Sequence, residues 1–281
     1  MELAAASCNN KESHTECQVP VNVHLYGLSV FQEEFDETKA VQDAEDYTGI
    51  NNLTVAFYNG STEVAKVTQT REDDTSYETF GEFSFTLPMG SYTMVALAYK
   101  TSENTSFSLT SPTAAAFIGD HVYETFASTQ AVDIDNTSAV DVGAVLNRIV
   151  SRLEVHYSDG KAAGATNIRM SFSAGAKAFN PTSGLATSDS GFSNTVPIST
   201  AVGATSNSVS YIFLASDEQD INVTIESLDA DGNTIFSKTV PNVPFKRNRK
   251  TILTGALYTN DALAGSFQVE TAWLENENVN F

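Results

Sequence analysis

The sequence is poor in cysteine and in basic residues. Its two cysteines, Cys8 and Cys17, allow only one disulfide. Fifteen Lys and Arg stand against 35 Asp and Glu, so the net charge is -20. Phosphate backbones and anionic lipid surfaces repel such a chain, and we expect no nucleic-acid partner. A continuous stretch of about 18 apolar residues, the minimum for a membrane-spanning helix, is also missing.

Histidine is scarce as well, and its four copies are scattered. His121 and Glu124 come closest to a pair of metal ligands. Residues three apart in a strand point to opposite faces, so this pair does not predict a metal site. The sequence Asp229 to Asn233 is similar to part of a calcium loop, but Val240 occupies the position of the distal glutamate. We therefore interpret it as a hairpin turn and expect no metal.

The sequence contains no catalytic or nucleotide-binding motif. It has no Gly-x-Ser-x-Gly elbow, no phosphate-binding loop and no Gly-x-Gly-x-x-Gly fingerprint. Acidic residues are so abundant that a pair of carboxylates carries no information about glycoside hydrolysis. We expect neither an enzyme nor a cofactor.

The N-terminus is similar to a bacterial lipobox, the end of a lipoprotein signal peptide. A small-residue run from Leu3 to Ser7 leads to Cys8 and then to polar residues. The charged and hydrophobic front part of a signal peptide does not precede it. We expect lipidation of Cys8 and an outer-membrane anchor formed by lipid chains alone. A disulfide with Cys17, or two plain thiols, are the alternatives.

Apolar and polar residues alternate throughout the chain, between turn-forming Gly, Asn, Asp and Pro. This pattern predicts an all-β fold. In the first half, strands are predicted over residues 19–30, 53–58, 63–70, 81–87, 92–99 and 122–133. In the second half, they are predicted over residues 152–157, 167–173, 208–215, 221–228, 234–240, 250–258 and 265–273.

Turn signals and composition complete the division of the chain. Asn59-Gly60, Asp159-Gly160 and Asp231-Gly232 predict hairpins. Residues 101–113 and 175–205, rich in Ser and Thr, are predicted to be loops, and residues 143–152 to form a helical turn or lead into a strand. We expect a remnant of a signal and a linker at 1–17, and two domains at 18–144 and 145–281.

Several segments together resemble the fimbrillin (type V pilin) superfamily of Bacteroidetes, which includes fimbrial subunits and their lipoprotein anchors. The resemblance covers most of the chain. It rests on Tyr47-Thr48-Gly49-Ile50, Leu53 to Gly60, Tyr77 to Phe83, Leu87 to Val95, Leu146 to Val155, and Val243 to Thr251 with Leu253 to Leu257.

The resemblance implies two tandem transthyretin-like β-sandwiches, export as a lipoprotein, and a place at the outer membrane or in a fimbrium. In polymerising members, a protease cuts after an Arg that follows the first strand, and a strand from the next subunit fills the opened groove. Here Lys39 stands where the family commonly has Arg, so the resemblance implies a cut between Lys39 and Ala40 by a protease that accepts Lys and, less favourably, one at Arg71. The alternative is a subunit that stays uncut, as anchor subunits do. The segment 267–281 is a candidate donor strand or the closing strand of the second domain.

Two functions follow from this interpretation. The first is a structural and adhesive fimbrial subunit whose partners are other subunits and the outer membrane. The second is a lipid-anchored module of the same fold that binds glycans or host proteins and never polymerises. Exposed Tyr and Phe would suit glycan binding, but aromatic residues at alternate strand positions are usually core.

Overall fold

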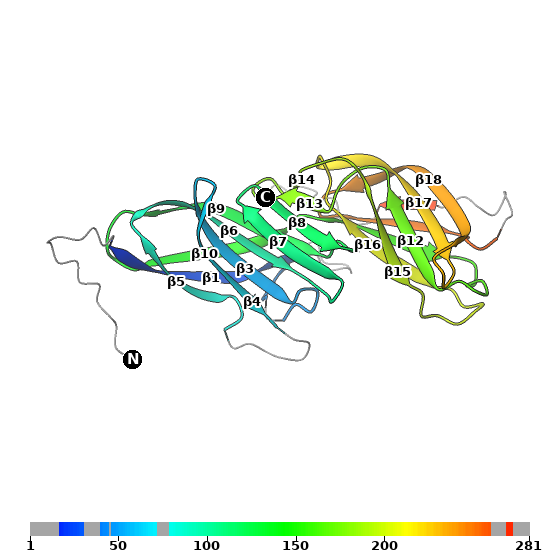
Figure 1. Cartoon of the computed structure of the whole chain (residues 1–281), viewed down its shortest axis with the longest axis horizontal. Helices are drawn as coiled ribbons and strands as arrows, with labels where there is room; N and C mark the ends of the chain where they lie inside the picture. Colours follow the sequence, from blue (N-terminus) through cyan, green and yellow to red (C-terminus); the bar gives the residue numbers. More distant parts are fainter. Residues whose placement is uncertain (1–16, 31–39, 45, 72–78, 260–267, 272–281) are drawn as a thin grey trace, which may run out of the picture.

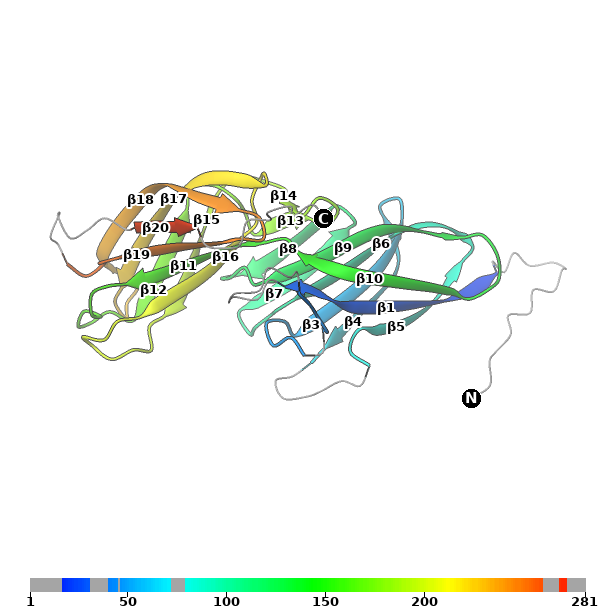
Figure 2. The same cartoon turned by 180° about the vertical axis from the view of Figure 1, so that it is seen from behind.

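The computed structural model describes residues 17–30, 40–44, 46–71, 79–259 and 268–271. These residues form strands, turns and bends and contain no helix. The molecule is elongated, with two β-sheet bodies arranged end to end (Figures 1 and 2). The prediction of an all-β fold is confirmed.

Twenty strands are present among the described residues. In the first half they are β1 (Gln18–Val30), β2 (Ala40–Gln42), β3 (Asn52–Asn59), β4 (Thr62–Thr70), β5 (Glu82–Pro88), β6 (Gly90–Tyr99), β7 (Thr105–Ser111), β8 (Ala114–Gly119), β9 (Thr125–Ile134) and β10 (Val140–Arg148). In the second half they are β11 (Ser151–Tyr157), β12 (Asn167–Phe172), β13 (Ala178–Asn180), β14 (Leu185–Ala186), β15 (Phe192–Pro197), β16 (Asn207–Ile212), β17 (Glu218–Leu228), β18 (Thr234–Lys246), β19 (Lys250–Gly255) and β20 (Gln268–Thr271).

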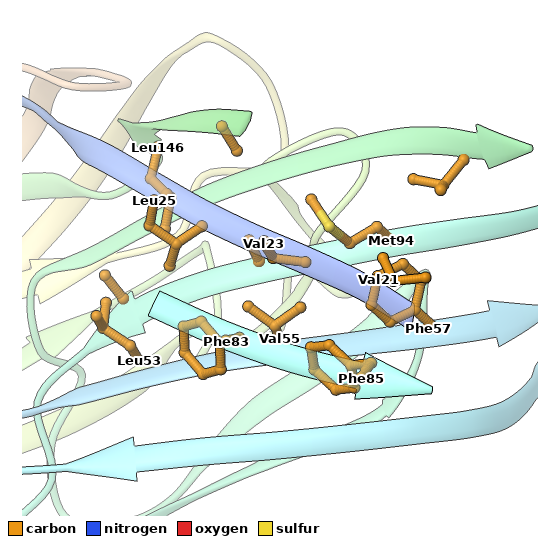
Figure 3. Packing of buried hydrophobic residues seen from close by; sticks show 14 of the residues in the cluster. Val21, Val23, Leu25, Leu53, Val55, Phe57, Phe83, Phe85, Met94 and Leu146 are labelled. Carbon is orange, nitrogen blue, oxygen red and sulfur yellow. The ribbon is translucent and has the colours of Figure 1, made fainter. Parts of the chain in front are cut away.

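The first half is built on one eight-stranded sheet. Its order is β2-β1-β10-β9-β6-β3-β4. Strand β2 pairs with residues 28–30 of β1, and β5 pairs with residues 18–24 of β1. The sheet curves round a core to which strands at both of its ends contribute, among them β1, β5, β3 and β6. In Figure 3, Val21 and Val23 of β1 point into the same space as Phe83 and Phe85 of β5. Burial of these alternating apolar side chains is what favours the curved sheet over a flat one.

The second half consists of two four-stranded sheets packed face to face. Their orders are β16-β11-β19-β20 and β15-β12-β17-β18. Apolar side chains from strands of both sheets fill the space between them, such as Leu153 and Val155 of β11 and Met170 of β12. Alternation of buried and less buried residues along β11 and β12 reflects this one-sided packing.

A third layer joins the two halves. The hairpin β7–β8 covers the outer face of β3 and β6, and β13 from the second half pairs with β8. Phe179 of β13 and Phe213 after β16 are fully buried there among first-half aromatic residues such as Phe117. Consequently β3 is buried on both faces over Asn52–Tyr58.

Three details of the sequence interpretation were wrong. Residues 101–113 contain β7, and residues 175–205 contain β13, β14 and β15, because burial against the first half orders these polar segments. Residues 143–148 continue β10 and β11 begins at Ser151, so of the two alternatives for residues 143–152 the one that leads into a strand is confirmed. Asp159-Gly160 joins strands of different sheets, whereas Asn59-Gly60 and Asp231-Gly232 do form the predicted hairpins.

Candidate strand-exchange site

The first strand of the chain lies in the interior of the first sheet. β1 pairs in parallel with β10, from Val21 with Val140 to Ser29 with Asn147. On its other side it pairs antiparallel with β5 over residues 18–24 and with β2 over residues 28–30. Once the chain is cut after it, an N-terminal strand that lies between strands from later in the sequence can leave, and the rest of the chain stays continuous. Its departure would expose unpaired backbone groups on both neighbours.

The apolar side chains of β1 form part of the core. They are Val19, Val21, Val23, Leu25 and Leu28, each at most 7% exposed. They meet Phe83 and Phe85 from β5 and Leu146 from β10 in one cluster. β1 thus presents a row of inward side chains that fills a groove, which is how an added strand obtains specificity as well as affinity.

A β-bulge in β1 shifts the phase of this row. Leu25 pairs with Ala144 and Gly27 with Val145, so Tyr26 is the extra residue. The shift allows both Leu25 and Leu28 to face the core, although they are three positions apart in the strand. It leaves Tyr26 on the outer face, 64% exposed.

The expected cut lies between β1 and β2. Lys39 is outside the described residues, while Ala40 is the first residue of β2 and its backbone pairs with Val30. The nine residues 31–39 thus connect two strand ends that are next to each other. A cut at Lys39 would leave β1 attached only by the hydrogen bonds and contacts given above.

Arg71, the second expected processing residue, is held by several contacts. Its guanidinium donates hydrogen bonds to the carbonyl oxygens of Tyr47 and Ile50, the latter at 3.1 Å. Its Cζ lies 5.0 Å from the centre of the Phe80 ring, and its backbone N–H donates to the Asn51 carbonyl at 2.9 Å. These contacts must break before a protease can bind this side chain.

Of the two cysteines, only Cys17, the first residue of the described part of the chain, is described. Cys8 is outside the described residues, and Cys17 is disulfide-bonded. Cys8 is the only other cysteine in the sequence. Because a sulfur atom that carries a lipid cannot also form a disulfide, the two expected uses of Cys8 exclude each other.

The C-terminal segment is described only over Gln268–Thr271. These residues form β20, which pairs antiparallel with β19 at an edge of the second half. Over this short range the segment acts as a closing strand.

The described residues contain neither a group of three or more possible metal ligands nor a helix able to span a membrane. Glu124, considered with His121, instead lies 2.6 Å from Nε of Arg148 and accepts a hydrogen bond from Tyr47 at 2.5 Å. Two parts of the site were missed in the sequence: the bulge at Tyr26 and the glycine beside it, Gly143. The available signal was the spacing of three between the apolar residues Leu25 and Leu28, which breaks the alternation of β1 at Tyr26 and Gly27.

The fold is similar to those of several solved structures of Bacteroides proteins. A candidate adhesin from Bacteroides ovatus is 11% identical, with 93% of this chain and 96% of that one covered at a TM-score of 0.52. A candidate adhesin from Bacteroides thetaiotaomicron is 11% identical, with 92% and 97% covered at 0.51. Candidate polysaccharide-binding proteins (DUF1812) from the same species are 10% identical, with 92% and 99% covered at 0.50.

By its fold and its site, the chain is thus an all-β protein with two sheet bodies and with an N-terminal strand in the interior of its first sheet. The chain belongs to the family of unknown function DUF6562, whose model matches residues 15–278. No curated protein matches the sequence.

Proposed function

We propose that this protein is a structural and adhesive subunit of a bacterial surface fimbrium that assembles by strand donation and performs no catalysis. The position of β1 carries the proposal: it is the first strand, it lies between β10 and β5, and it is followed by Lys39. The resemblance to fimbrillins and the fold shared with candidate adhesins support it. We also propose that both bodies are transthyretin-like sandwiches.

The proposed mechanism begins with a cut after Lys39. β1 then leaves, and the edges of β10 and β5 become available to an extended segment of another subunit. Main-chain hydrogen bonds would supply affinity, and side chains in the places of Val21, Val23 and Leu25 would supply selectivity. Burying each such Val or Leu side chain contributes about 1.5–3 kcal/mol, so binding of a donated strand in the open groove is strongly favourable.

Export and anchoring form the second part of the proposal. We propose that Cys8 is lipidated in the exported protein, which requires that the disulfide of Cys17 is not formed there, and that the lipid holds the protein at the outer membrane before or during assembly. Mass spectrometry of the N-terminus of protein from the native surface tests this directly. A lipid on Cys8 or a new terminus at Ala40 supports the proposal, whereas an intact Cys8–Cys17 disulfide excludes the lipid.

Assembly is tested with a lysine-specific protease on the purified full chain. We expect cut protein to form a ladder of oligomers, and Lys39→Ala to stay monomeric under the same treatment. Lys39→Arg serves as the matched variant, because an arginine-specific protease should then trigger assembly that it does not trigger in the natural sequence. The proposal would be refuted if cut protein stays monomeric and the protein is never found in surface fibres.

A further inference from the structure

The outer face of β1 carries an exposed aromatic side chain in a fixed position. Tyr26 is the bulged residue of the strand, and bulges often turn a side chain toward a site. A Cβ atom at position 143 would overlap the Tyr26 ring, so the ring lies over the bare backbone of Gly143 on β10. His24 lies beside it with its ring nearly parallel, at 19° and a centroid distance of 6.4 Å.

Polar groups surround this ring on the same face of the sheet. Asn22 donates a hydrogen bond to the Asp141 carboxylate at 2.9 Å, and His24 Nδ1 contacts the Glu82 carboxylate. The pairings of β1 with β5 and β10 place Glu82 and Asp141 on opposite sides of β1. Both carboxylates are exposed and keep unused acceptor positions.

We propose that the outer face of β1 is a carbohydrate-binding site for a neutral glycan, centred on Tyr26. The C–H groups on one face of a pyranose ring carry partial positive charge and pack on the negative face of an aromatic ring. Hydroxyl groups at the rim of the sugar would donate to Asp141 and Glu82 and accept from Asn22. The proposal deepens the adhesive part of the proposed function for the uncut protein, because strand donation would remove β1 and with it the site.

Charge decides which glycans are suitable. The chain carries a net charge of -20, and the two groups beside Tyr26 that are oriented to bind hydroxyls are carboxylates. Sulfated or uronic-acid glycans would be repelled, while neutral hexoses offer hydroxyl donors without a charge penalty.

Shielding of a cross-strand glycine by an aromatic ring is a purely structural alternative for Tyr26. It requires only that the ring cover Gly143, and any bulky apolar side chain at position 26 would do this. Tyr26→Leu therefore separates the two roles, since it keeps the cover and removes the aromatic face. Because the site contains β1, it exists only while β1 is in place.

The test uses the uncut full chain in affinity electrophoresis against mannan, laminarin and xyloglucan, with heparin as the anionic comparison. We expect retardation by at least one neutral polysaccharide, a loss of at least tenfold in Tyr26→Leu, and retention in Tyr26→Phe. Val202→Ala is the matched control, because Val202 is equally exposed at 64%. Thermal melting of every variant confirms that it is folded.

Three outcomes overturn the inference: no retardation by any neutral polysaccharide, unchanged retardation of Tyr26→Leu, or a preference for heparin. None of them bears on assembly, which is measured on protein cut at Lys39. Conversely, glycan binding by a protein that never polymerises would keep this inference and refute strand donation.

Discussion

The guanidinium of Arg148 and the carboxylate of Glu124 form an ion pair of 2.6 Å, with side chains only 5% and 11% exposed. Arg148 is the last residue of β10, just before the chain passes to the second half, and its Cζ lies 5.1 Å from the Phe126 ring centre. Tyr47 completes the group by donating to the other carboxylate oxygen. Burial and the adjacent Glu124 raise the pKa of Tyr47, so its hydroxyl stays a donor.

The first prediction concerns this pair. Glu124→Gln removes the carboxylate charge that faces the buried Arg148 guanidinium, and we expect a loss of about 3–5 kcal/mol in the free energy of unfolding. Glu63→Gln is the control, because the Glu63–Lys66 pair is over a third exposed and should be worth about 0–1 kcal/mol. Urea unfolding measures both, and equal losses would contradict the assigned burial.

The second prediction concerns acid stability through Glu226. The hydrogen bond from Arg169 at 2.6 Å lowers the pKa of Glu226 below its ordinary 4.5. A depressed folded-state pKa gives stability that is present above about 4.5 and is lost as pH falls through the folded value. We therefore expect Glu226→Gln to be less stable than the natural protein at pH 7, with the difference closing as the pH falls below 4.5.

Urea unfolding at pH 7, 5, 4 and 3 checks this expectation. Glu218→Gln is a suitable control, because the Glu218–Lys246 pair is more than half exposed and solvent screens it. A stability difference between Glu226→Gln and the natural protein that stays constant with pH would show that the Glu226 carboxylate does not contribute pH-dependent stability.

Much of the fold could be predicted from the sequence because strand alternation is local. β3, β4, β6 and β11 lie within two residues of their predicted ranges, since each buries alternate side chains or lies beside a clear turn signal. The prediction of an all-β fold is also correct for every part of the chain that the structure describes.

Long-range packing could not be predicted in the same way. Phe179 lies in a segment of Gly, Ser, Thr and Asn that has the composition of a loop, yet it is fully buried against residues some 60 positions earlier. Likewise, Glu124 was compared with His121 because they are near in sequence, while its actual partner Arg148 lies on another strand. Composition carries no information about such partners.

The third prediction concerns a glycine at the end of β8. Gly119 has a φ of 123°, and a Cβ there would overlap the carbonyl oxygen of Asn104. Gly232 also has positive φ, at 83°, but a Cβ there meets no atom within 4 Å. We expect Gly232→Ala to cost about 1–2 kcal/mol from backbone conformation alone, and Gly119→Ala to cost clearly more. Thermal melting ranks the two, and the opposite order would contradict the tight approach of β7 to β8.

The last prediction concerns the joint between the halves. Phe179 and Phe213 stack with ring centroids 4.2 Å apart, and the Phe213 ring lies 6.3 Å from that of Phe117 in the first half. Phe179→Ala should cost about 3–5 kcal/mol through the cavity that it leaves. Since this cavity lies where the halves meet, we expect calorimetry to resolve two unfolding transitions in the variant where the natural protein shows one.

Ile118→Ala provides the control on the neighbouring β8, because Ile118 is 58% exposed and should change little. A double-mutant cycle with Phe213→Ala should give a coupling of about 0.5–1.5 kcal/mol, as expected for an aromatic pair in contact. Additive effects and a single transition in Phe179→Ala would mean that the halves unfold together for another reason. With the joint intact, tension applied to one half of the subunit would be transmitted to the other through packed aromatic rings and the β8–β13 pairing, in addition to the single connection at residues 149–150.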